Sequence, residues 1–175
     1  MYYLLLIPVF IIIYIIISFN GFKSRYIKTD ESYSGIDVAL SKRYNLITNL
    51  VETVKGYAKH EKDTLELVTN LRTMNKDNLE EYNETLDKSM NQIIMLVESY
   101  PEIKADTNFL HLQKSLNDVE EHLQAARRLH NRNVADYNTY IQMSPRNLIP
   151  TIKEAKTKPY FEANKEERDN VQITL

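Results

Sequence analysis

The sequence contains no cysteine and only three glycines among its 175 residues. Without cysteine the chain has no disulfides, no thiolate metal sites and no cysteine nucleophile. The shortage of glycine argues against hairpin-rich β folds and against glycine-rich phosphate-binding loops. Proline is absent between residues 9 and 100, so no residue in that long stretch forces a helix to end. These absences favour an all-α chain.

The chain also lacks an excess of either charge. Its 22 basic and 24 acidic residues give a formal net charge of −2, and the two signs are mixed along the sequence. Phosphate binding needs a basic face, so we expect no nucleic-acid partner. No charged residue precedes Lys23. The chain therefore consists of two chemically different parts.

The first part is a long apolar run. Residues 2–19 read YYLLLIPVFIIIYIIISF, without a charge. As a helix this run spans about 27 Å, close to the roughly 30 Å hydrocarbon core of a bilayer. A cleaved signal peptide needs a basic segment before the run and small residues at its end. Neither is present, so we predict an uncleaved single-pass anchor that contacts the lipid bilayer through residues 2–19.

The basic residues next to the apolar run predict its orientation. Lys23, Arg25 and Lys28 follow the run, and no Lys or Arg precedes it. The positive-inside rule then places the C-terminal body in the cytoplasm and the N-terminus outside. We expect the protein at a cell membrane in this orientation.

The second part carries three apolar stripes with helical spacing. The first predicts a helix from about Ser32 to Thr73, the second a helix that ends at Pro101, and the third a helix capped by Asp106 or Thr107 and closed by Pro145. The stripes are Ile36, Leu40, Ile47, Leu50, Val54, Leu65 and Val68; Leu79, Tyr82, Leu86, Met90, Ile93, Val97 and Tyr100; and Phe109, Leu112, Leu116, Val119, Leu123, Ala126, Leu129, Val134, Tyr137 and Ile141.

These stripes predict an all-α fold: a transmembrane helix, then an elongated antiparallel bundle of about three long helices. The second helix is too short to match the others. Either the long helices overhang it, or the first helix breaks near Gly56. A short helix near residues 147–156 and an extended tail held by Tyr160 and Phe161 complete the expected fold.

The expected segments are an anchor (1–22), a juxtamembrane linker (23–34), the bundle (35–144), and a short helix with a tail packed on or beside the bundle (145–175).

No pattern in the sequence indicates catalysis, a cofactor or a metal. Bundle metal sites use Glu-x-x-His pairs, and none of the four histidines has a carboxylate three residues before it. His130 lies on the third stripe, where we expect a buried, hydrogen-bonded histidine. The acidic pairs at 80–81 and 120–121 are interpreted as solvated charge, because neighbouring helix residues point in different directions. We therefore expect no enzyme, no cofactor and no small-molecule substrate.

Charges on the predicted seams are more informative. The register of the first helix places Arg43, Tyr57 and Glu61 on or beside its apolar stripe. A buried charge is costly unless it is paired. These residues therefore predict either an interhelical ion pair that fixes the register of the helices or an exposed groove for a partner helix.

A basic cluster lies on one side of the third helix. It consists of Arg127, Arg128 and Arg132. These side chains can pair with acidic residues of the first helix, with anionic lipid or with the acidic face of a partner.

Several long segments resemble the LemA family of bacterial membrane proteins. They are SGIDVALSKRYNLITNLVETVKGYAKHEKDTLELVTNLR (34–72), SYPEIKADTNFLHLQKSLNDVEEHLQAARRLHNRNVADYN (99–138), and NLIP and KPYFEA in the tail. The resemblance implies an N-terminal anchor and a long-helix bundle but no specific activity. The residues of the family pattern that we take as candidate interaction or register residues are Asp37, Arg43, Asn49, Glu61, Arg127 and Arg128.

The expected function is a non-catalytic interaction or scaffold role, with unidentified membrane or envelope proteins as partners. The main alternative is a peripheral lipid-binding or membrane-remodelling module. In that case anionic headgroups would be bound by Arg127, Arg128 and Arg132 or by the basic residues Lys55, Lys59 and Lys62.

Overall fold

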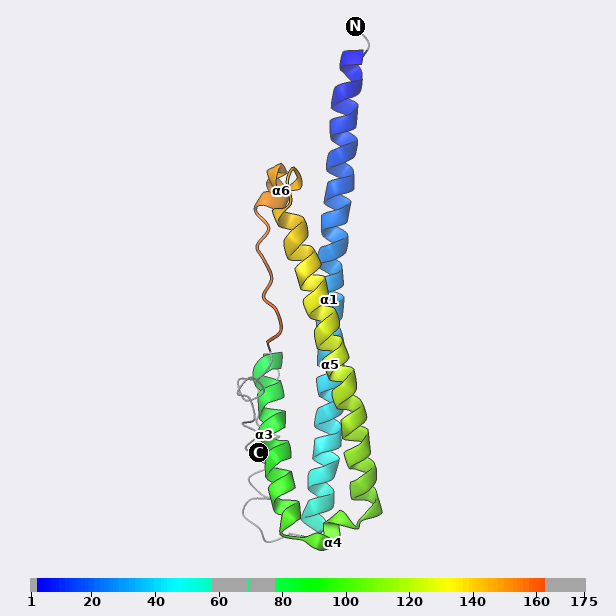
Figure 1. The fold of residues 1–175 in the computed structure, drawn as a ribbon, viewed down its shortest axis with the longest axis vertical. Helices are drawn as coiled ribbons and strands as arrows, with labels where there is room; N and C mark the ends of the chain where they lie inside the picture. Colours follow the sequence, from blue (N-terminus) through cyan, green and yellow to red (C-terminus); the bar gives the residue numbers. More distant parts are fainter. Residues whose placement is uncertain (1–2, 58–68, 70–77, 163–175) are drawn as a thin grey trace, which may run out of the picture. The chain divides into compact units, whose positions relative to one another are not determined.

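The computed structural model describes residues 3–57, 69 and 78–162, and these residues contain helices and no strand. The all-α expectation is therefore confirmed. Figure 1 shows the elements, which in chain order are α1 (Tyr3–Tyr57), α3 (Leu79–Glu98), α4 (Pro101–Lys104), α5 (Thr107–Gln142), the 3₁₀ turn η1 (Arg146–Leu148) and α6 (Pro150–Lys153).

Helix α1 is a single uninterrupted helix of 55 residues. Among the described residues, α1 is the one helix that is long and apolar enough to cross a membrane, and the apolar residues are in its N-terminal part. Residues 23–34, expected to be a linker, are helical, so the apolar run and the first bundle helix are parts of one element. The predicted extension to Thr73 and the possible break near Gly56 involve residues 58–68 and 70–77, which lie outside the described part of the chain.

The chain divides into two compact units that do not follow the expected segments. Unit 1 comprises residues 1–34 and 127–161, and unit 2 comprises residues 35–126 and 162–175. Helices α1 and α5 each contribute to both units. The expected bundle of residues 35–144 is therefore divided within α5, because this helix packs on the N-terminal part of α1 from Arg127 onward.

Unit 2 contains the described part of the first seam, the second seam and the start of the third. The first stripe is fully buried at Ile36, Leu40, Ile47 and Leu50, whereas its Leu65 and Val68 lie outside the described residues. The second stripe is buried apart from the half-buried Met90 and Tyr100, and the third is buried from Phe109 to Leu123. The α1 residues Thr53 and Tyr57 hydrogen-bond to Asn108 and Asp106 at the start of α5. The C-terminal end of α1 therefore meets the N-terminal end of α5, and these helices run antiparallel.

Side-chain caps explain where α3 and α5 begin. The side-chain oxygen of Asn78 accepts hydrogen bonds from the amides of Glu80 and Glu81. Asp106 Oδ1 accepts from the amides of Asn108 and Phe109 at 2.8 and 3.0 Å, so Asp106 caps α5. The Phe109 amide and then the Tyr57 hydroxyl lower the pKa of the Asp106 carboxyl, because both hydrogen bonds favour the charged form.

Unit 1 is an antiparallel pair of helical segments. Four contacts join them at regular intervals: Ser18 with Tyr140, Arg25 with Asp136, Lys28 with Asn133, and Ser32 with His130. Leu129, which we assigned to the third stripe, is 53% exposed, because the buried position of that turn belongs to His130. The short helix expected near residues 147–156 is present as α6, but it is confined to Pro150–Lys153 because Pro150 starts it, and the 3₁₀ turn η1 precedes it.

The tail of unit 1 is extended and held by asparagines. Asn138 exchanges two hydrogen bonds of 2.9 Å with the backbone of Lys158. Asn131 bonds the backbone of Phe161 in the same way, at 2.8 and 2.9 Å. Pro159 favours an extended Lys158, which suits this pairing. Phe161 is buried, as expected, whereas Tyr160 is exposed and does not hold the tail.

Candidate functional site

A polar network joins the three helices of unit 2 around Arg43. Its guanidinium lies 2.6 Å from Asp87 Oδ1 on α3 and 3.5 Å from Glu120 Oε2 on α5. It also donates to Asn83 Oδ1 at 2.9 Å, and Asn83 donates in turn to the second carboxylate oxygen of Asp87. Only 12% of the Arg43 side chain is exposed. The sequence left two arrangements open for Arg43: an interhelical ion pair or an exposed groove for a partner helix. The structure has the interhelical ion pair.

The other candidate residues that the structure describes do not join this network. Asp37 and Asn49 are exposed on α1, and Glu61 lies outside the described residues. The Arg127 guanidinium lies over the Phe161 ring, 5.2 Å from its centroid. Arg128 is exposed. The described candidate residues therefore do not form one site. Arg127 contacts the tail of unit 1, and no ion pair between described residues involves it.

Unit 2 carries a shallow groove that sequence reasoning missed. Its volume is about 220 Å³. It is lined by Gly35, Val38, Ala39 and Lys42 of α1 and by Val119 and His122 of α5. Gly35 and Ala39 are one helical turn apart, and a Cβ added at Gly35 would meet no atom within 4 Å. The pair of small residues leaves a hollow beside the exposed Val38. Two small residues four positions apart in a helix are the sequence signal from which this groove could have been predicted.

Aromatic and cationic side chains interleave in unit 1. The guanidiniums of Arg25 and Arg146 both lie over the Tyr140 ring, at 4.1 and 4.4 Å from its centroid. Lys158 Nζ lies 3.9 Å from the Tyr26 centroid and 2.5 Å from Asp30 Oδ1. Such contacts favour cations that are partly removed from water. These charges therefore hold the helices of unit 1 together.

His130 is buried in unit 1, as the sequence predicted. Its Nδ1 lies 3.3 Å from the Ser32 hydroxyl, and its ring packs near that of Tyr33. Burial lowers the pKa of His130 below 6.5, and the positive charge of Lys158 lowers it further. A hydrogen bond to the Thr29 carbonyl and the negative charge of Asp30 act in the opposite direction, but burial is the largest effect. The folded protein therefore favours the neutral ring.

This shift predicts a loss of stability in acid. Between the lowered folded pKa and the unfolded value near 6.5, the unfolded chain binds more protons, so stability falls as the pH drops through this window. We expect thermal unfolding of the detergent-solubilised protein to shift downward below pH 6.5, and less so for His130→Gln. His111→Gln, at an exposed position, serves as the control and should keep the wild-type pH profile. A pH profile unchanged by His130→Gln would contradict the assignment.

Among the described residues, no group of three or more histidine and acidic side chains is close enough to hold a metal ion. Asp87 forms an ion pair with Arg43, and Asp30 forms one with Lys158. These carboxylates are therefore engaged with basic side chains of the protein itself.

Comparison with known proteins gives one family. A family model described as the LemA family matches residues 32–175. No curated protein matches the chain.

Proposed function

Because the chain belongs to the LemA family, we propose that it is a non-catalytic interaction protein held at the bacterial cell membrane by the N-terminal part of α1. In this proposal unit 2 presents its helical surface, including the groove beside Val38, to another membrane or envelope protein. The observation that carries the proposal is the continuity of α1, which joins the apolar run directly to a wall of the groove.

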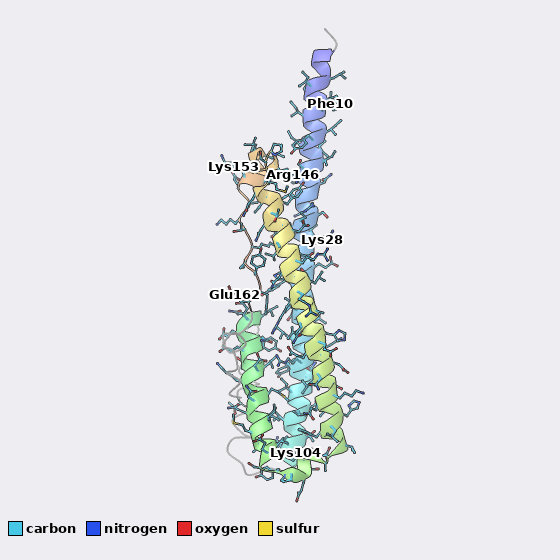
Figure 2. All side chains as sticks on the ribbon, in the orientation of Figure 1. Phe10, Lys28, Lys104, Arg146, Lys153 and Glu162 are labelled. Carbon is cyan, nitrogen blue, oxygen red and sulfur yellow. The ribbon has the colours of Figure 1, made fainter. Side chains whose placement is uncertain are left out.

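The composition of α1 supports the anchor. Large apolar side chains are exposed along the run, including Ile17 and Phe10, of which Phe10 is labelled in Figure 2. Water would meet a continuous hydrocarbon surface there, and such surfaces mark membrane or protein contacts. A bilayer is the natural solvent for a charge-free helix of this length.

The groove supports the interaction role. Val38 and Ala39 supply its apolar part, and Lys42 and His122 add polar groups. An apolar centre with a polar rim is the usual composition of a protein interface. The buried polar groups of unit 2 support a non-catalytic role, because Arg43, Asp87 and Asn83 are engaged in holding the helices.

A photo-crosslinking residue tests the groove. Benzoylphenylalanine in place of Val38 should give a discrete protein adduct in living cells, several-fold above the same substitution at Ile94. Ile94 is an exposed, apolar position on α3 of the same unit and does not line the groove. Equal adducts at both positions, or none at either, would refute the groove as the contact site.

The alternative, a peripheral lipid-binding or membrane-remodelling module, is favoured by one observation. Arg128 and Arg132 are exposed, and no ion pair between described residues involves them. Photo-reactive residues at these two positions would then form adducts with lipid rather than with protein.

The orientation of the anchor has its own test. We propose that the body is cytoplasmic, as the basic residues after the apolar run predict. The chain has no cysteine, so Lys104→Cys introduces a unique thiol at an exposed site. We expect a membrane-impermeant maleimide to leave it unlabelled in intact cells and to label it after permeabilisation. Labelling in intact cells would place unit 2 outside the cytoplasm.

A further inference from the structure

The residues that follow α5, including η1 and α6, form a small tip on unit 1, which we define as residues 143–153. Two of its apolar side chains are strongly exposed: Leu148 at 74% and Met143 at 50%. The Arg146 guanidinium lies 3.9 Å from Met143 Sδ, and Lys153 lines a common hollow with Leu148. Figure 2 labels both basic residues at this end of the unit. The tip therefore combines projecting apolar side chains with a basic rim.

The tip is held in place by a compact cluster beneath it. Ile152 is buried against Tyr137, Tyr140 and Ile141 of α5, and Phe22 of α1 packs on the same cluster. The exposed Leu148 and Met143 are therefore carried by a folded base rather than by a free loop.

The contacts with α1 show where the tip lies along that helix. The Tyr140 hydroxyl donates to the Ser18 carbonyl at 2.9 Å. Gly21 allows this close approach, since a Cβ there would lie 2.3 Å from the Tyr140 hydroxyl oxygen. The two helices run antiparallel, so α5 reaches the end of the apolar run at Tyr140, and Ile152 of the tip packs in the same cluster as Phe22, just after that run.

The position of Ser18 and Gly21 relates the tip to the membrane. Both lie at the end of the charge-free part of α1, directly before Lys23 and Arg25. If the apolar run crosses the bilayer, this region is at the boundary between acyl chains and headgroups. Aromatic rings with a polar end, such as Tyr140, favour that depth.

We propose that the tip is a second contact with the bilayer, on the same side as the body. Leu148 and Met143 enter the boundary between headgroups and acyl chains, and Lys153 and Arg146 face lipid phosphates. Burial of apolar side chains combined with attraction to anionic lipid is the usual basis of interfacial binding. This inference rests on the proposed membrane anchor, because α1 brings the tip to the lipid surface.

The continuity of the tip with the anchor favours lipid over a protein partner. The tip meets α1 at the end of the apolar run, where the nearest external surface is the bilayer that surrounds the run. Its charge also fits, since the two basic side chains next to Leu148 match the negative surface of a bacterial phospholipid leaflet.

The test uses unique thiols in the full-length chain. Three variants with one cysteine each are labelled with an environment-sensitive fluorophore: Leu148→Cys, Leu129→Cys and Ile12→Cys. Each is reconstituted into phosphatidylglycerol-containing vesicles with or without brominated acyl chains. Leu129 is the matched control, because it is an exposed leucine of unit 1 far along α5 from the tip. Ile12 reports on the anchor itself.

We expect brominated lipid to quench Ile12 and Leu148 at least twofold more than Leu129. Quenching of Ile12 without quenching of Leu148 would overturn the tip contact and leave the anchor standing. Absence of quenching at Ile12 would overturn the anchor and the tip contact together. A Leu148 probe protected from aqueous iodide but not quenched by brominated lipid would point to a protein partner and overturn the proposal.

Discussion

Leu50→Asp is expected to unfold unit 2. The Leu50 side chain is completely buried at the centre of the α1 stripe, with Ile47 and Val54 one turn away on the same face. Truncating a buried leucine costs about 2–5 kcal/mol, and an unpaired carboxylate adds a further desolvation cost. The sum is comparable to the whole stability of a domain, about 5–15 kcal/mol. We expect a loss of helical circular dichroism and of the cooperative thermal transition.

Leu116→Asp on α5 should have the same effect, because Leu116 is buried on the facing seam. Leu110→Asp is the matched control: Leu110 lies on the same helix of the same unit but is 49% exposed. Its melting temperature should stay close to that of the wild type. Unchanged helicity and melting in both buried variants would show that the seams are misplaced.

Arg43→Met is expected to lower the free energy of unfolding by about 2–4 kcal/mol. The substitution preserves much of the side-chain volume but leaves the carboxylates of Asp87 and Glu120 without the cation between them. Removing one partner of a buried ion pair costs about 3–5 kcal/mol, and partial exposure of the two carboxylates reduces this cost. Urea unfolding of the full chain in detergent micelles measures the change.

A surface ion pair provides the control for Arg43→Met. Lys88 and Glu84 are also separated by 2.6 Å, but both side chains are more than half exposed. Lys88→Met should change stability by less than about 0.5 kcal/mol, because exposed pairs contribute little. Asp87→Asn combined with Arg43→Met should recover part of the loss, since one uncompensated carboxylate is removed. Equal effects of Arg43→Met and Lys88→Met would contradict a structural role for the network.

The helices of unit 2 were predictable because their information is local. A stripe with steps of three and four residues defines one face of a helix wherever that face packs, and Ile36, Leu40 and Leu50 are buried as the period requires. The seam position of Arg43 followed from the same register. Its partners did not, because several acidic residues of the other helices were equally suitable before the offset of those helices was known.

Unit 1 was not predictable in the same way. Its tail is held by Asn131 and Asn138, whose amides bond to the backbone of residues 20 to 30 positions later. Such bonds have no periodic signature in the sequence. Lys158 meets Asp30 across 128 positions, and no local pattern links them. For the same reason the sequence indicated two aromatic anchors in the tail, whereas only Phe161 is buried.

The antiparallel pairing in unit 1 also fixes the order in which the protein is completed during synthesis. Ser32 and His130 are 98 positions apart, and Thr29 and Lys158 are 129 positions apart. At about 5–20 residues per second, a ribosome needs roughly 5 to 25 seconds to cover these distances. Until then the N-terminal part of α1 lacks the α5 segment and the tail that pack on it in the folded protein. The first segment of unit 1 to leave the ribosome is therefore paired only after about a hundred further residues have been made.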